Sequence, residues 1–124
     1  MTDFTRPPLS YYAPPGIIRI SPEALKAARD LDYTARRSHR IRDALVSFEW
    51  FTGGTLRRKP DGPETELGPS LGLGAGERAN VPKEAIQTID GLDLAIKIPA
   101  EVYNESRERL IVVDETQFHG LALR

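Results

Sequence analysis

The 124-residue sequence contains no cysteine. This absence excludes disulfide bonds, thiolate nucleophiles, zinc sites with thiolate ligands and iron–sulfur clusters held by cysteine. Histidine is also scarce, because His39 and His119 are the only two, so a histidine-rich metal site is excluded as well. We therefore expect the protein to carry no cofactor, neither an iron–sulfur cluster nor stoichiometric zinc.

An excess of one charge is missing too, since 17 lysines and arginines face 18 acidic residues, for a net charge of −1. This balance gives no bulk attraction for nucleic acid or anionic lipid. The longest apolar runs, such as Leu110–Val113, are far too short to span a bilayer, and no secretory signal is recognisable. We expect a cytoplasmic protein without a membrane partner, and we do not favour nucleic acid as a partner.

Two segments are predicted from length and proline content. Residues 1–16 carry prolines at positions 7, 8, 14 and 15 around Tyr11 and Tyr12, and proline fixes φ and removes a hydrogen-bond donor. These residues are expected to form an extended arm on the domain's own surface or on a neighbouring subunit. A proline-rich recognition ligand is the weaker alternative, because PxxP spacing is missing. Residues 17–124 are long enough for one domain with a real core.

A helix is predicted to begin at Ser21–Glu23, where serine is an N-cap, proline the first helical residue and glutamate an acid in the first turn. Leu25, Ala28 and Leu31 then recur at helical spacing. A basic run follows, which either forms a solvated face or holds phosphate: Arg36, Arg37, His39, Arg40 and Arg42.

A β-hairpin is predicted next. Apolar and polar residues alternate through Ala44–Phe51, as in a half-buried strand. The segment Thr52–Thr55 contains two glycines and reads as a turn, with Leu56–Lys59 returning before Pro60–Pro63 ends the strand. The segment Leu67–Gly76 lacks the strand, turn and long helix of a dinucleotide fingerprint, so we expect a mobile or bulged glycine-rich strand there.

The last third of the chain is regular. The Asp90–Gly91 turn introduces an alternating strand over Leu92–Ile98, and Pro99 ends it. A short helix over Ala100–Ser106 and strands over Leu110–Val113 and Phe118–Leu123 are expected to follow. The order predicts an α+β fold: a small curved or barrel-like mixed β-sheet with one N-terminal helix and a short second helix.

This order of elements resembles the HesB-like family, the A-type iron–sulfur carriers, over Ile17–Leu123. The similar features are an Ile-Ser-Pro type entry into an alanine-rich helix, a strand running into Gly53–Gly54, the opening Ile89–Leu92 of a later strand, and a final Gly-Leu-Ala-Leu. In the family a ligand cysteine follows the glycine pair and a Cys-Gly-Cys tail ends the chain. Thr55 occupies the first of these positions here and the tail is missing, so the resemblance implies the fold without the cluster chemistry.

The favoured ligand site surrounds the predicted turn, where charges and an indole ring would gather at one end of the sheet and could hold a small anion or a ring-containing ligand. Its residues are Glu49, Trp50, Gly53, Gly54, Thr55, Arg57 and Arg58, with Lys59 next to them. The plainer interpretation places the tryptophan in the core and cross-strand ion pairs outside it.

Two other functions remain open. A small enzyme or metal protein could use His119 with Glu49, Asp114 or Glu115, and a phosphate or nucleic-acid binder could use Arg36–Arg42 and Arg57–Lys59. Ser70 lacks the G-x-S-x-G context of a hydrolase nucleophile, and surface solvation explains Glu64 and Glu66 better than a carboxylate pair.

No catalytic set emerges from these residues, so we expect a binding or assembly module and not an enzyme. Its ligand would be a small anion or a protein partner. The strand-rich domain should also leave sheet edges that a second copy covers, as a homodimer.

Overall fold

The computed structural model describes residues 9–38, 40–57, 60–105, 109–117 and 119–124. Along the chain the elements are the 3₁₀ turn η1 (Leu9–Tyr11), β1 (Arg19–Ile20), α1 (Pro22–Arg37), β2 (Ala44–Phe51), β3 (Gly54–Arg57), β4 (Glu64–Leu67), β5 (Ser70–Glu77), the 3₁₀ turns η2 (Arg78–Asn80) and η3 (Lys83–Ala85), β6 (Ile86–Ile89), β7 (Leu92–Lys97), α2 (Ala100–Tyr103), β8 (Leu110–Val113) and β9 (Leu121–Leu123).

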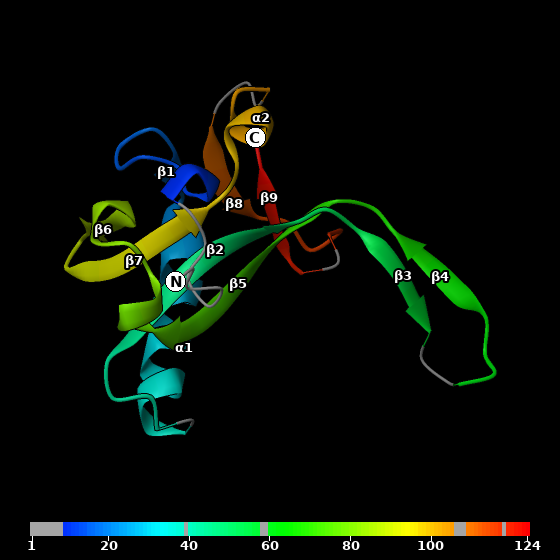
Figure 1. Cartoon of the computed structure of the whole chain (residues 1–124), viewed down its shortest axis with the longest axis horizontal. Helices are drawn as coiled ribbons and strands as arrows, with labels where there is room; N and C mark the ends of the chain where they lie inside the picture. Colours follow the sequence, from blue (N-terminus) through cyan, green and yellow to red (C-terminus); the bar gives the residue numbers. More distant parts are fainter. Residues whose placement is uncertain (1–8, 39, 58–59, 106–108, 118) are drawn as a thin grey trace, which may run out of the picture.

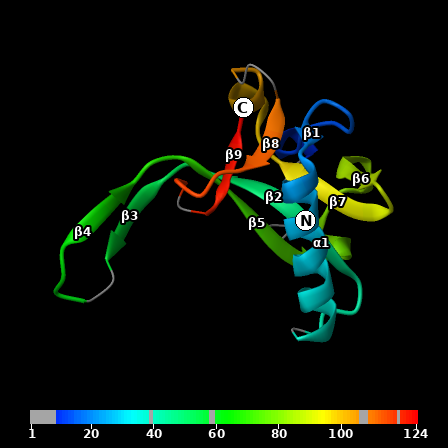
Figure 2. The ribbon, with the colours of Figure 1, turned by 180° about the vertical axis from the view of Figure 1, so that it is seen from behind.

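Seven strands form one curled, half-barrel sheet in the order β1-β8-β9-β5-β2-β7-β6. It is mixed, because β1 runs parallel to β8 and β2 parallel to β7, while the remaining pairs are antiparallel. Helix α1 lies against one face of this sheet (Figures 1 and 2). The predicted α+β fold with one N-terminal helix and a short second helix is confirmed. No helix in the described ranges is long and apolar enough to cross a membrane.

Helix α1 begins where the sequence indicates. The backbone N–H of Ala24 donates to Ser21 Oγ at 3.2 Å, and proline occupies the first helical position. Ala24, Leu25 and Ala28 are buried against the sheet in the same cluster as Phe48. The small alanines let the helix approach closely, and each large side chain buried there contributes about 1.5–3 kcal/mol.

The described part of the proline-rich arm packs on its own domain. Tyr12 is buried against Leu45 and Ala95, on the sheet face turned away from α1. The backbone N–H of Ala13 also donates to the carbonyl of Ile96 at 2.8 Å. Tyr11 remains about half exposed. Of the two surfaces considered for the arm, residues 9–16 therefore use the domain's own, and residues 1–8 lie outside the described ranges.

The predicted hairpin between Ala44–Phe51 and Leu56–Lys59 is wrong. Strand β2 pairs with β5 and β7, and β3 pairs with β4. The chain thus continues from β2 into β3 without reversing its direction. The reversal comes between Arg57 and Glu64, before the antiparallel strand β4. Strands β3 and β4 form a two-stranded ribbon that extends away from the rest of the molecule (Figures 1 and 2).

The glycine pair bends the strand and does not reverse it. Gly53 and Gly54 have φ angles of 102° and 153°, which glycine adopts readily and other residues avoid. Phe51 faces Ser70 before the bend and Gly54 faces Leu67 after it, so two residues on each strand separate the paired segments and the register is unchanged. Body and ribbon are consequently one long hairpin with a bend.

Other predicted elements match more closely. The Asp90–Gly91 turn joins β6 to β7, with φ angles of 50° and 81° that suit a tight hairpin turn. The glycine-rich segment forms the strand β5, as predicted, but the predicted bulge is wrong, because all eight residues of β5 pair with β2 in one unbroken register. Within the described part of the chain, the short helix ends at Tyr103 and the last strand is Leu121–Leu123. Ser106 and Phe118 lie outside the described residues.

Candidate functional site

Strand β2 separates two residues that were predicted to share a site. Successive side chains of a strand point to opposite faces. Phe48 is buried in the main core and Trp50 is partly buried against it, on the face covered by α1. Glu49 therefore faces the other side of the sheet, as does Ser47. The plainer interpretation of Trp50 as a core residue is the one that the structure supports.

The remaining predicted residues lie on or beside the ribbon. Thr55 and Arg57 are exposed there, beyond the bend at Gly53 and Gly54. The guanidinium of Arg57 donates to Glu64 Oε1 at 2.7 Å and to the carbonyl of Pro60 at 3.1 Å, so a cross-strand ion pair engages it. Arg58 and Lys59 lie outside the described residues. The predicted set is thus not a single site, and Glu64 pairs with an arginine and not with Glu66.

Glu49 instead lines a small cleft of about 180 Å³ on the face turned away from α1. Six polar side chains line this space, from elements far apart in the sequence: Tyr12 from the arm, Ser47 and Glu49 from β2, Glu77 from β5, Asn80 from η2, and Lys97 from β7. We call this space the Glu49 cleft.

The Glu49 carboxylate rests on the backbone of β5. Ser47 Oγ donates to Glu49 Oε1 at 3.2 Å, and Ser47 itself is only 8% exposed. Gly74 lies directly across from Ser47 in the β2–β5 ladder. A Cβ atom at position 74 would come within 3.3 Å of Glu49 Oε2, tighter than an ordinary contact. The Glu49 carboxylate therefore occupies space that is free because residue 74 has no side chain.

Lys97 brings the opposite charge to the same cleft. In the parallel pair β2–β7 it is the register partner of Glu49, on a strand about 4.8 Å away. Among the described residues its ammonium makes no ion pair or hydrogen bond, not even with the neighbouring carboxylate. Among the described residues, the Glu49 cleft thus holds an unpaired cation beside a carboxylate that accepts a hydrogen bond from the Ser47 hydroxyl.

The Tyr12 side chain is 7% exposed and lies near Glu49. Burial raises the pKa of its phenol above the ordinary value, and the negative charge of Glu49 raises that pKa further. Tyr12 consequently stays a neutral hydroxyl at physiological pH, able to donate or accept a hydrogen bond. The cleft combines two carboxylates, an ammonium, an amide and two hydroxyls, which suits it to hold a small charged molecule.

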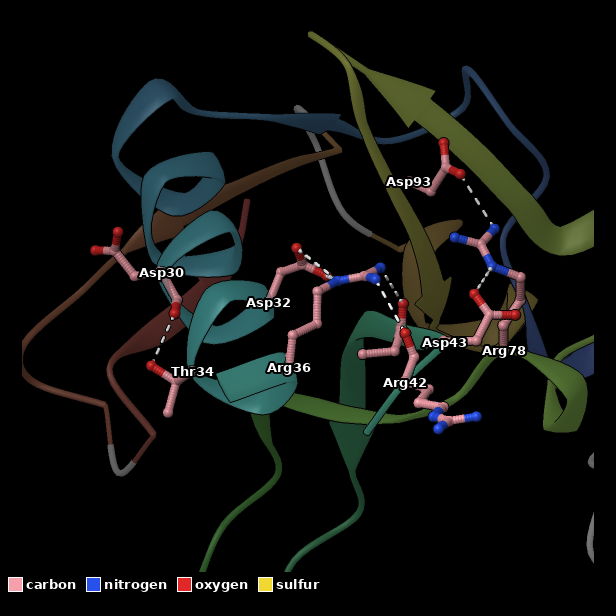
Figure 3. A network of polar contacts seen from close by, with 9 residues as sticks. Asp30, Asp32, Thr34, Arg36, Arg42, Asp43, Arg78 and Asp93 are labelled. Carbon is pink, nitrogen blue, oxygen red and sulfur yellow. Dashed lines mark hydrogen bonds and ion pairs between the residues drawn. The ribbon is translucent and has the colours of Figure 1, made fainter. Parts of the chain in front are cut away.

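Two arginines of the basic run, Arg36 and Arg37 at the end of α1, contact other groups of the protein, and Figure 3 shows the contacts of Arg36. Arg36 pairs with Asp32 at 3.2 Å, and it donates to the backbone carbonyls of Arg42 and Ala44 at 3.2 and 2.9 Å. Arg37 lies over the ring of Tyr33, 5.3 Å from its centroid. The guanidinium of Arg36 thus ties the end of the helix to the start of β2, and a phosphate would have to displace those bonds. His39 lies outside the described residues.

A second ion-pair network continues from this junction (Figure 3). Arg78 donates to Asp43 at 3.0 Å and to Asp93 at 3.1 Å, and Asp93 also accepts from the hydroxyl of Thr88. The hydrogen bond from Thr88, followed by Arg78, holds the pKa of Asp93 below its usual range. The hydrogen bond to Asp43 chiefly raises the pKa of Arg78. This network joins η2, β7 and the loop before β2.

No metal site forms around His119 in the part of the chain that the structure describes, where no three His, Asp or Glu side chains converge. The His119 ring lies 4.9 Å from the ring of Phe51, at the base of the ribbon. Asp114 accepts hydrogen bonds from Thr116 and Arg124, which lower its pKa and close the turn before β9.

Neither a known protein family nor a curated protein sequence nor a solved structure matches this chain. The site therefore has to be judged from its own geometry. Of the residues in the cleft, the sequence pointed to Glu49 as a site residue but not to Tyr12, Ser47 or Lys97. These three lie beside Glu49 only because of strand pairing and the path of the arm. The one sequence signal for the cleft is the alternation of glycines at 72, 74 and 76, which leaves one face of β5 without side chains.

Proposed function

We propose that this protein is a HesB-like domain without an iron–sulfur cluster that acts in the cytoplasm as an assembly module, joining a second copy of itself through the β3–β4 ribbon. The observation that carries the proposal is the ribbon itself. Its two strands pair with each other and with no other described strand, and its described side chains are exposed. An isolated two-stranded hairpin is marginally stable in water, and its free edges are templates for pairing.

The register indicates which face of the ribbon a partner would bury. Within the ribbon, register partners share a side, so positions 54, 56, 65 and 67 belong to one side and positions 55, 57, 64 and 66 to the other. The sequence has leucine at positions 56 and 67, whereas Thr55, Arg57, Glu64 and Glu66 share the other side. This alternation in the sequence is typical of a sheet with one covered side.

A second copy of the chain is the partner that would bury this face of the ribbon on both chains at once. In a two-fold dimer each ribbon finds the same surface on its neighbour, and neither copy keeps an uncovered ribbon. The order of elements supports the HesB-like part of the proposal, and the absence of the family's ligand cysteines supports assembly without cluster transfer. Protein purified without oxygen should accordingly show no visible absorption from a cluster.

Sedimentation of the full chain and of a ribbon-shortened variant tests self-association. Gly54 and Leu67 are register partners, so replacing residues 55–66 with Asn-Gly closes the hairpin at a two-residue turn and leaves the body's register intact. We expect the full chain to be a dimer and the variant a folded monomer. A monomeric full chain, or a variant that still dimerises, would show the proposal to be wrong.

Two threonines offer a matched pair of point variants. Thr65 and Thr55 are both exposed on the ribbon, but they lie on opposite faces of it. Thr65→Lys places a charge on the side of the ribbon that includes positions 54, 56 and 67, and it should weaken the dimer. Thr55→Lys places the same charge among the polar residues and should leave the dimer unchanged. Equal effects of the two substitutions would contradict the assignment of the interface to one face.

A further inference from the structure

The Glu49 cleft brings the partly buried Glu49 and Lys97, which carry opposite charges, close together without an ion pair, and the exposed Glu77 adds a second carboxylate to its lining. The carboxylate of Glu49 accepts from Ser47, and Lys97 has no ion-pair partner among the described residues although it is the register partner of Glu49. Both side chains are partly buried, where solvent screens their charges less than on an open surface. A ligand that enters this cleft meets both charges at once.

Most simple ions are disfavoured by one of the two groups. An anion attracted to Lys97 meets the negative charge of Glu49, with Glu77 also lining the cleft. A metal ion attracted to Glu49 meets the ammonium of Lys97. A neutral molecule leaves both charges without a partner. The electrostatics instead match a molecule that brings an ammonium to the carboxylate and a carboxylate to the ammonium.

The size of the cleft sets an upper limit on such a molecule. A volume of about 180 Å³ corresponds to roughly six water molecules at about 30 Å³ each. Gly76 lines the same cleft, and a Cβ atom built at this position would have nothing within 4 Å. The space beside Glu49 is thus open, and it suits a compound of a few heavy atoms and not a nucleotide or a peptide.

We propose that the Glu49 cleft binds a small zwitterion with the chemistry of a free α-amino acid. The ligand ammonium pairs with the Glu49 carboxylate, and its carboxylate pairs with the Lys97 ammonium. The hydroxyls of Tyr12 and Ser47 line the same space and supply further hydrogen bonds. This binding is separate from the proposed self-association, because the cleft lies on the body of the domain and not on the ribbon.

Binding of L-alanine to the full-length protein tests this site, followed by the backbone amide signals of Gly74 and Gly76 in NMR spectra. Two analogues remove one charge each: N-acetylalanine has no ammonium, and alaninamide has no carboxylate. We expect alanine to shift these signals and each analogue to bind at least about tenfold more weakly. No shift at about 10 mM alanine, a concentration that detects a Kd of roughly 1 mM, would overturn the proposal. Equal binding of either analogue would overturn it as well.

Three variants examine the cleft, with a control on the ribbon. Glu49→Gln and Lys97→Met each remove one charge and should weaken alanine binding at least about tenfold. Gly76→Val fills the open space without changing a charge, so it provides the test if a charge variant does not fold. Glu66→Gln removes a carboxylate from the ribbon and should bind alanine like the unaltered chain. Unchanged binding by folded Lys97→Met or Gly76→Val protein would place the ligand elsewhere and refute the proposal.

Discussion

Gly72→Ala should destabilise the protein, because the ring of Phe51 occupies the space that a side chain would need. A Cβ atom at position 72 would lie 2.7 Å from Phe51 Cε2 and 3.3 Å from His119 Cγ. Carbon atoms in contact are normally about 3.5–4.0 Å apart, so the ring would have to move by roughly 0.8 Å. Phe51 is 42% exposed and can swing outward, at the loss of its packing against β5 and His119.

The expected penalty is about 1–2 kcal/mol in the free energy of unfolding, in the lower part of the range for overpacked sites. Replacing any glycine also restricts the unfolded chain, which stabilises by about 0.4–1 kcal/mol and would hide part of the penalty. Gly76→Ala supplies the matched control, because position 76 lies on the same face of β5 with nothing within 4 Å. Urea unfolding at one fixed protein concentration should place Gly72→Ala about 1–2 kcal/mol below Gly76→Ala.

A double-mutant cycle identifies the cause. With Phe51→Ala in place the ring is gone, and only His119 remains close to the new methyl group. The Gly72→Ala penalty should then fall below about 0.5 kcal/mol, which gives a coupling energy of about 1 kcal/mol between the two positions. The reasoning is refuted if Gly72→Ala is as harmless as Gly76→Ala, or if its penalty is the same with and without the Phe51 ring.

Three further predictions concern backbone strain, a buried amide and pH. Gly53→Ala should cost about 1–3 kcal/mol at its φ of 102°, whereas Gly68→Ala, between β4 and β5 and without a positive φ, should be tolerated. Amide exchange should become faster in β3 and β4 of the Gly53→Ala variant alone. Gln87→Met should raise stability in urea by about 1 kcal/mol, because the buried Gln87 Nε2 has no hydrogen-bond partner among the described residues; a loss of stability would mean that the amide forms a hydrogen bond after all. Asp93 has a folded pKa below the unfolded value, so its stabilisation is present above the ordinary aspartate pKa of about 3.9 and is lost as pH falls through the folded pKa. The partly exposed Asp93→Asn variant should therefore lose a few tenths to about 1 kcal/mol at pH 7 and nearly nothing at about pH 2, and a deficit independent of pH would contradict this origin.

The helices, strands and turns that depend on residues close together in the chain could be predicted from the sequence. The Ser21 cap, the alternation along Ala44–Phe51 and the Asp90–Gly91 turn each depend on residues a few positions apart. Hydrogen bonds and side-chain alternation over such short distances do not depend on the rest of the chain. Those elements were predicted correctly, and with them the α+β class and the curved mixed sheet.

Whether the glycine pair forms a turn or a bend, and which residues surround Glu49, depends on contacts between distant parts of the chain. Two glycines with positive φ suit a turn and a bend equally well, and the choice is made by pairing with residues 64–77, farther along the chain. Lys97 joins Glu49 because β7 lies parallel to β2, and Tyr12 joins it because the arm crosses that face. Such contacts are stabilised by burial and ladder hydrogen bonds between distant segments, for which a local pattern carries no signal.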